Sequence, residues 1–200
     1  MYLIKVEMDR RSAIPLLADC QQMHRFVTSL FGVDRKTAQV LYRTNLAHDR
    51  LYIYLYANMQ AVSVPENCVL QQRDMTSWLN GMSEGDVLSF ELVASPSKKI
   101  GDRDRKNSQR RILREPILRQ AWMEHRAELS GFELLRCDEV EQIHITGKHR
   151  EHNGGTMYHD AYRYCGVLRI VDATAFRQAV QSGIGPGRAY GFGMLMVKPL

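Results

Sequence analysis

The sequence lacks the features that mark secreted and membrane-spanning proteins. Its four cysteines form no CxxC pair and lie far apart, at Cys20, Cys68, Cys137 and Cys165. This pattern predicts free thiols in a reducing compartment and no disulfide framework. No apolar run reaches the roughly 18 residues of a membrane span. The first residues, MYLIKVEMDRR, lack the basic-then-apolar order of a signal peptide. We therefore expect a cytoplasmic protein with no membrane partner.

Positive charge, by contrast, is concentrated in one segment. The chain has 200 residues and a net charge of +5. Residues 98–114 hold eight basic and two acidic residues, a net +6, so the rest of the chain is nearly neutral. The basic residues are Lys98, Lys99, Arg103, Arg105, Lys106, Arg110, Arg111 and Arg114. A basic run on a neutral body indicates a phosphate-binding surface, although a solvated charge run explains the composition equally well.

The first half of the chain alternates between strand and helix patterns. The expected order is strand, helix, strand, strand and short helix, over Tyr2–Met8, Asp19–Phe31, Gln39–Leu46, Leu51–Ala57 and Met75–Asn80. Gly32 ends the first helix. Two segments, Ala61–Val64 and Val69–Gln72, compete for a further strand.

The second half predicts a β-α-β-β-α-β order. Its expected elements are Leu88–Ala94, Pro116–Leu129, Gln142–Arg150, Tyr158–Val171, Asp172–Val180 and Tyr190–Val197. Pro116 suits the first turn of a helix, Asp172 can cap one, and Asn153-Gly154 is typical of a hairpin turn. We therefore predict an α+β protein of tandem ferredoxin-like (βαββαβ) domains, residues 1–84 and 85–200, each an antiparallel sheet with two helices on one face.

The most specific stretch is rich in glycine. Within eleven residues lie Gly183, Gly185, Gly187, Gly191 and Gly193. A dinucleotide-binding GxGxxG is excluded by its spacing and because this loop follows a helix and opens a strand. We expect no nucleotide or other small-molecule cofactor. Two interpretations remain: an ordinary turn, or a loop whose backbone N–H groups approach a polynucleotide, with Arg188 adding charge.

The run GIGPGRAYGFGMLMVKPL resembles the C-terminal glycine-rich loop of the Cas6e family of CRISPR-associated endoribonucleases, a G-[IV]-G-P-x-[KR]-[AS]-x-G-x-G-L-L-type run. MYLIKV resembles the family's M-[YW]-L-[ST]-K-[VL] opening, with Ile4 at the Ser/Thr place. Ala94–Lys98 resembles the family's A-N-P-x-K, and Ala121–Met123 its A-W-L helix. The matches follow the family's order from residue 2 to residue 200. The resemblance implies a tandem RAMP-type fold and cleavage of CRISPR precursor RNA.

The resemblance also implies a catalytic histidine. The family's Y-x-[ML]-H pattern matches Gln21-Gln22-Met23-His24, which makes His24 the expected catalytic residue and puts Gln21 in the place of the tyrosine. By periodicity alone, the favoured interpretation of His24 is a half-buried helix residue at the edge of the apolar stripe. In RNA the 2′-OH can attack the adjacent phosphate in line, leaving a 2′,3′-cyclic phosphate and a 5′-OH without a metal. A histidine can act as acid or base in this step, and the sequence does not decide between the two roles.

The expected partners are a CRISPR repeat hairpin and the other subunits of a Cascade-type complex. Such a stem is recognised largely by its shape and phosphates. The expected RNA-binding residues are Arg25, Lys98, Lys99, Arg103, Arg105, Lys106, Arg110, Arg111, Arg114, Lys148, Arg150, Gly185, Gly187, Arg188 and Gly191. For Lys148 and Arg150 the alternative is a solvated hairpin tip. For the whole protein, the alternatives are a non-catalytic RNA-binding subunit and an unrelated ferredoxin-like binding module.

Two further patterns favour structural interpretations. Histidines gather at His144, His149, His152 and His159, but their spacing is not HExxH and no acidic or cysteine partner has convincing spacing, so we expect no metal site. Tyr52, Tyr54 and Tyr56 share one strand face. Because the flanking residues do not match an RNA-recognition motif, packing is favoured over base stacking.

Overall fold

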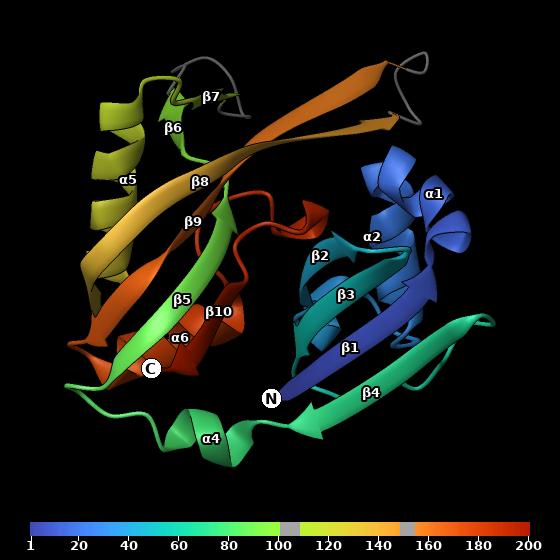
Figure 1. The fold of residues 1–200 in the computed structure, drawn as a ribbon, viewed down its shortest axis with the longest axis horizontal. Coiled ribbons are helices and arrows are strands. Elements are labelled where there is room, and N and C mark those ends of the chain that lie inside the picture. The colour runs from blue at the N-terminus through green and yellow to red at the C-terminus, as the bar shows by residue number, and fades with distance from the viewer. Residues whose placement is uncertain (101–108, 149–154) are drawn as a thin grey trace.

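The computed structural model describes residues 1–100, 109–148 and 155–200. Two four-stranded antiparallel sheets lie side by side, with a separate two-stranded sheet above the second (Figure 1). This arrangement confirms the predicted α+β fold of tandem ferredoxin-like units. Among the described residues, no helix is both long and apolar enough to cross a bilayer.

The first sheet has the strand order β2-β3-β1-β4. Its strands are β1 (Tyr2–Asp9), β2 (Leu41–Ala47), β3 (Arg50–Ala57) and β4 (Cys68–Asp74). The alternation in β1 puts Ile4, Val6 and Met8 in a core shared with helix α2 (Cys20–Ser29), where they are at most 2% exposed. Asp19 begins α2 because its side chain accepts a hydrogen bond from the Gln21 N–H at 2.9 Å.

The first unit departs from the prediction in its helices. Helix α1 (Arg10–Ala18) and helix α3 (Arg35–Ala38) were not predicted, while residues 58–67, between β3 and β4, contain no helix. The predicted short helix at Met75–Asn80 is confirmed, as residues 76–80 are helical, but it follows β4 instead of preceding the last strand of this sheet. Val69–Gln72 lies within β4, whereas Ala61–Val64 forms no strand. The backbone N–H groups of Val62 and Ser63 donate instead to the Leu30 carbonyl at the end of α2.

The second sheet has the complete βαββαβ order, with strands arranged β10-β5-β9-β8. Its elements are β5 (Val87–Ala94), α5 (Pro116–Leu129), β8 (Phe132–Lys148), β9 (Thr156–Ile170), α6 (Ala173–Ser182) and β10 (Leu195–Pro199). Phe132 lies between Phe90 and Phe176 in its core, with ring centroids 6.4 and 6.0 Å apart. Pro116 is the first residue of α5, and Asp172 caps α6, as predicted.

Several boundaries in this half differ from the prediction. Strand β8 begins at Phe132, ten residues before the expected Gln142, and β10 begins at Leu195, because Gly191 and Gly193 have φ values of 87° and 85° that interrupt a strand. The basic segment holds two unpredicted strands, β6 (Ser97–Ile100) and β7 (Gln109–Ile112), which pair with each other. The short helix α4 (Thr76–Asn80) connects the two sheets.

Side chains join the two sheets into one body. Arg43 on β2 donates a hydrogen bond to Glu91 on β5. Leu41 and Tyr56 from the first sheet belong to the same apolar cluster as Leu195 from the second. The packing interpretation of the tyrosine stripe is thus confirmed for Tyr56, which is 4% exposed.

Candidate functional site

The expected catalytic helix meets the glycine-rich loop. Helix α2 contacts both the short 3-10 helix η1 (Arg188–Tyr190), inside that loop, and strand β8. In Figure 1 the red glycine-rich segment extends from the second sheet toward α2 and β2. The long β8–β9 hairpin extends over α1 and α2 in the same view. Residues near positions 24, 148 and 188 are therefore brought to one region by tertiary packing.

His24 lies half-buried on α2, at the edge of the buried side formed by Cys20, Met23 and Val27. With Arg25, Thr28 and Asp34 it lines an open pocket of about 460 Å³. Burial, together with the nearby Arg35 guanidinium, holds the pKa of His24 below its ordinary value of 6.5. In the free protein the imidazole is therefore mostly neutral at pH 7, which is the form that can accept a proton.

Arg35 is a site residue that sequence reasoning missed. It begins α3, where Asp34 caps the helix through the N–H groups of Lys36 and Thr37. Burial and the positive charge of Arg188 lower the pKa of Arg35, and its Nε is buried without a hydrogen-bond partner in the described part of the chain. Arg35, Lys36 and Arg188 line a pocket of about 290 Å³ in which no lining residue is acidic. Three cations gathered in this way form a site for an anion.

Arg188 also borders a second basic pocket on the other side of the loop. That pocket, about 260 Å³ in volume, is lined by Arg126 and by Gly183 and Gly185 of the loop. Burial and the Arg126 guanidinium lower the pKa of Arg188. The Arg188 Nε donates a hydrogen bond to the Gly185 carbonyl at 3.1 Å, which fixes the side chain against its own loop. Arg126, like Arg35, was not among the predicted site residues. It lies on a partly buried side of α5, and no sequence motif marks it as a binding residue.

The glycines of the loop have positive φ and tight surroundings. Gly185, Gly187 and Gly191 have φ values of 81°, 80° and 87°. A Cβ at Gly187 would lie 2.5 Å from the Phe192 ring, and one at Gly191 would lie 2.9 Å from the Tyr42 ring. Packing inside the protein therefore explains why these positions need glycine. Contact of their N–H groups with RNA stays a prediction.

A phenol lies beside Gln21, where the family has its tyrosine. The Tyr190 side chain of the glycine-rich loop lies near the Gln21 side chain, and burial raises the pKa of Tyr190. The Tyr190 ring stacks on His159 of β9, with centroids 4.1 Å apart. The hydroxyl is thus neutral at pH 7 and held at the start of α2, one helical turn before His24.

The other expected RNA-binding residues fall into three groups. Lys148 lies beside α2, because its N–H donates to the Asp19 carboxylate at 3.3 Å, and Arg25 is exposed on α2 itself. Exposed residues of the basic segment lie away from α2 in Figure 1, on β6, on β7 and just after it: Lys98, Lys99, Arg110, Arg111 and Arg114. Four residues lie outside the described ranges, so their predicted roles stay untested: Arg103, Arg105, Lys106 and Arg150.

Two of the four clustered histidines have assigned contacts. His144 Nδ1 lies 2.5 Å from the Asp160 carboxylate, and His159 stacks on Tyr190. His149 and His152 lie outside the described residues. Across residues 1–100, 109–148 and 155–200, no three His, Cys, Asp or Glu side chains gather as metal ligands would. The expectation of no metal stays a prediction.

This architecture defines a class of α+β proteins built from tandem ferredoxin-like units. A family model described as "CRISPR associated protein" matches residues 1–199, and the chain belongs to that family. It is 30% identical over 127 residues to the CRISPR-associated endoribonuclease Cse3 of Thermus thermophilus, a match that spans 59% of this chain and 58% of that relative. Over 213 residues, covering 100% of both chains, it is 28% identical to the CRISPR system Cascade subunit CasE of Escherichia coli.

The fold agrees with solved structures of this family. A structure of the CRISPR endoribonuclease Cse3 bound to a 19-nucleotide RNA matches with a TM-score of 0.82 and 22% identity, covering 100% of both chains. The structural likeness confirms the tandem fold. Together with the family match, it confirms the resemblance read from the sequence motifs.

Proposed function

We propose that this protein is an endoribonuclease that cleaves CRISPR precursor RNA at its repeat hairpins and keeps the mature RNA as a Cascade subunit in the cytoplasm. The observation that carries the proposal is the meeting of His24, Arg35 and Arg188 where α2 faces the glycine-rich loop. A neutral imidazole near the Arg35 guanidinium, which in turn lies near Arg188, suits a phosphodiester. Neither arginine has an ion pair among the described residues, so both charges are available to a phosphate. The names of the relatives, an endoribonuclease and a Cascade subunit, support the same activity.

The chemistry uses the nucleophile of the substrate. The 2′-oxygen attacks the adjacent phosphorus, the bond from phosphorus to the 5′-oxygen breaks, and the products are a 2′,3′-cyclic phosphate and a 5′-OH. One proton leaves the 2′-OH and one reaches the 5′-oxygen, so no water or metal enters the balance. His24, neutral in the free protein, takes up a proton from one of these oxygens or returns it to the other. A bound phosphate would raise its pKa, because an anion favours the imidazolium.

The remaining residues bind and orient the RNA. Arg35 and Arg188 stabilise the charge of the phosphorane, and Tyr190 donates a hydrogen bond to the reacting phosphate from the start of α2. Lys148 holds the stem beside α2. The basic strands β6 and β7, with the other predicted RNA-binding residues of segment 98–114, bind the stem farther from the reacting phosphate. In this account residues 1–84 supply the catalytic helix, and residues 85–200 supply most of the RNA surface.

One observation favours a second function. Gln21 replaces the family's tyrosine, and a protein that had lost a reacting group would remain an RNA-binding subunit without cleavage. The two functions differ in one assay, in which the repeat hairpin of the same genome is labelled and incubated with the protein in EDTA. Cleavage that leaves a 2′,3′-cyclic phosphate supports the endoribonuclease. Binding without cleavage supports the second function, and neither binding nor cleavage would contradict both.

A further inference from the structure

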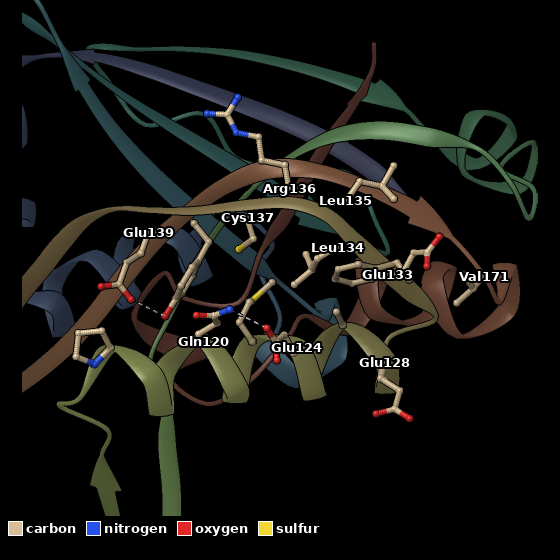
Figure 2. A pocket seen from close by; sticks show the side chains of 15 residues that line it. Gln120, Glu124, Glu128, Glu133, Leu134, Leu135, Arg136, Cys137, Glu139 and Val171 are labelled. Atoms are coloured by element: carbon tan, nitrogen blue, oxygen red, sulfur yellow. Dashed lines mark hydrogen bonds between the residues drawn. The ribbon is translucent and has the colours of Figure 1, made fainter.

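A groove separates α5 from β8 on the second unit, outside the site already described. Its volume is about 750 Å³. Figure 2 shows α5 along one wall, with Gln120, Glu124 and Glu128, and the β8 strand arching along the other, with Leu134 and Cys137 turned toward the space between them. The buried Met123 and Phe132 form its floor. The groove thus combines an apolar floor with an acidic wall.

Two of the carboxylates at this groove lack a strong cationic partner. Glu139 is paired with Arg119 at 2.6 Å and Glu133 with Arg169 at 2.9 Å. Glu124 accepts a hydrogen bond only from the neutral Gln120 amide, at 3.0 Å. Glu128, with a side chain 82% exposed, has only His125 at 3.8 Å. In the described part of the chain, neither Glu124 nor Glu128 is paired with a lysine or arginine.

The spacing of these two residues favours an external cation. Glu124 and Glu128 are four residues apart on α5, so they face the same side of the helix. Like charges at this spacing destabilise a helix. A lysine or arginine of a bound partner would offset that repulsion. RNA phosphates, in contrast, would add to it, which separates this groove from the basic pockets around Arg188 and Arg126.

The apolar part of the groove favours a side-chain contact over strand addition. Leu135 and Val171, at its border, are 46% and 50% exposed. Strand β8 is the edge of its sheet, but its register shifts between Leu134 and Arg136 and again between Glu139 and Glu141. Such bulges interrupt the row of backbone groups that an added strand would need. An amphipathic helix that lays its apolar side into a groove needs no such row.

We propose that the groove between α5 and β8 binds an amphipathic protein segment that carries apolar side chains on one side and lysine or arginine residues flanking them. The segment belongs to another subunit of the CRISPR ribonucleoprotein, and this part of the inference rests on the proposed function. The segment's cations meet Glu124 and Glu128, and its apolar side chains cover Leu134 and Val171. Since the groove lies outside the basic pockets, RNA and this segment bind the protein together.

The probe is a pair of fluorescent peptides of equal length, one of leucine and lysine and one of leucine and glutamate at helical spacing. They are titrated into the full chain at physiological salt, where long-range attraction is largely screened. We expect the leucine–lysine peptide to bind at least tenfold more tightly than the other. Glu124→Lys/Glu128→Lys should abolish this preference. The control Glu66→Lys/Glu84→Lys changes the net charge equally at exposed residues outside the groove, and it should keep the preference.

If both double variants lose affinity for the leucine–lysine peptide equally, the proposal is overturned, because the peptide would then respond to the net charge of the protein and not to the groove. A peptide that binds both variants as tightly as wild type would overturn it too. Hairpin cleavage is measured on the same preparations and reports the proposed function separately. Co-purification with the other co-expressed subunits then tests the occupant. We expect Glu124→Lys/Glu128→Lys to cleave RNA yet drop out of the complex. If this variant stays in the complex, the bound segment does not come from another subunit.

Discussion

The Tyr42 hydroxyl donates a hydrogen bond to the Ala189 carbonyl, at 3.1 Å, and so ties strand β2 to the glycine-rich loop. Tyr42 is 2% exposed, and its ring fills the side of Gly191 where a Cβ would lie. The first unit thereby fixes the backbone that carries Arg188 and Tyr190. The candidate site depends on this junction, since Arg35 and His24 come from one unit and Arg188 from the other.

Tyr42→Phe should loosen the loop without emptying the core. The loss of one hydrogen bond from a partly buried carbonyl costs about 1 kcal/mol of unfolding free energy, and the hairpin cleavage rate should fall more than RNA affinity does. Denaturant unfolding and single-turnover cleavage check the two effects. Tyr56→Phe, at another buried tyrosine of the same sheet, is the matched control and should leave the cleavage rate unchanged.

Arg35→Gln should weaken cleavage of the repeat hairpin by about 10- to 100-fold, as expected for one charge-assisted contact to a phosphate of about 1.5–3 kcal/mol. The fold should persist, because Arg35 has no described ion pair to lose. The exposed Arg73 on β4 provides the control: Arg73→Gln removes the same charge far from the loop. If both variants cleave equally well, Arg35 has no specific role.

The pH dependence should report His24. Burial and the Arg35 charge hold the pKa of His24 below 6.5, so the inflection that it causes in kcat/KM should lie below pH 6.5. Arg35→Gln removes a cation that disfavours the imidazolium, so the pKa of His24 rises and the inflection moves to higher pH. A full pH–rate profile of both proteins measures the shift, and an inflection that stays in place or moves down would contradict the assignment.

Tyr190→Phe should keep the ring stacked on His159 and remove only the hydroxyl. Cleavage should slow by about tenfold, which corresponds to about 1.4 kcal/mol, while RNA affinity stays nearly the same. Tyr158, which is 75% exposed on β9, gives the control variant Tyr158→Phe. A Tyr190→Phe protein that cleaves like wild type would show that the phenol only packs.

The β6–β7 hairpin should bind the RNA stem through charge. Lys99 and Arg110 lie directly opposite each other across the two strands, and like charges in such a pair destabilise the sheet. Lys99→Ala/Arg110→Ala should therefore weaken RNA binding and lower the slope of log affinity against log salt by about 2, while thermal stability holds or rises. Unchanged salt dependence would exclude these residues from the interface.

The sequence correctly predicts the strands that bury one face, because apolar residues alternate with polar ones along them. Tyr2–Met8 and Leu88–Ala94 alternate because each lies in a sheet with one side on a core, and both are strands. Helix α1 escaped prediction because Pro15 lies inside it and only Ala13 is buried. The first ten residues of β8 escaped because this edge strand is mostly exposed on both faces.

The candidate site was predictable only in part. His24 and Arg188 were found through motifs that the chain shares with its family. Arg35 and Arg126 carry no motif, and their approach to Arg188 depends on how the two units pack. The contact between Gln21 and Tyr190 has the same origin. Local patterns do not encode such contacts, because residues far apart in the chain make them.

The most direct test of the account is single-turnover cleavage of the repeat hairpin by His24→Ala, with binding measured on the same protein. His125→Ala, at a histidine whose side chain is 65% exposed on α5, is the matched control. We expect His24→Ala to bind the hairpin like wild type and to cleave it at least about 100-fold more slowly, within the range for a lost acid–base group, while His125→Ala cleaves normally. Cleavage by His24→Ala at the wild-type rate would contradict it.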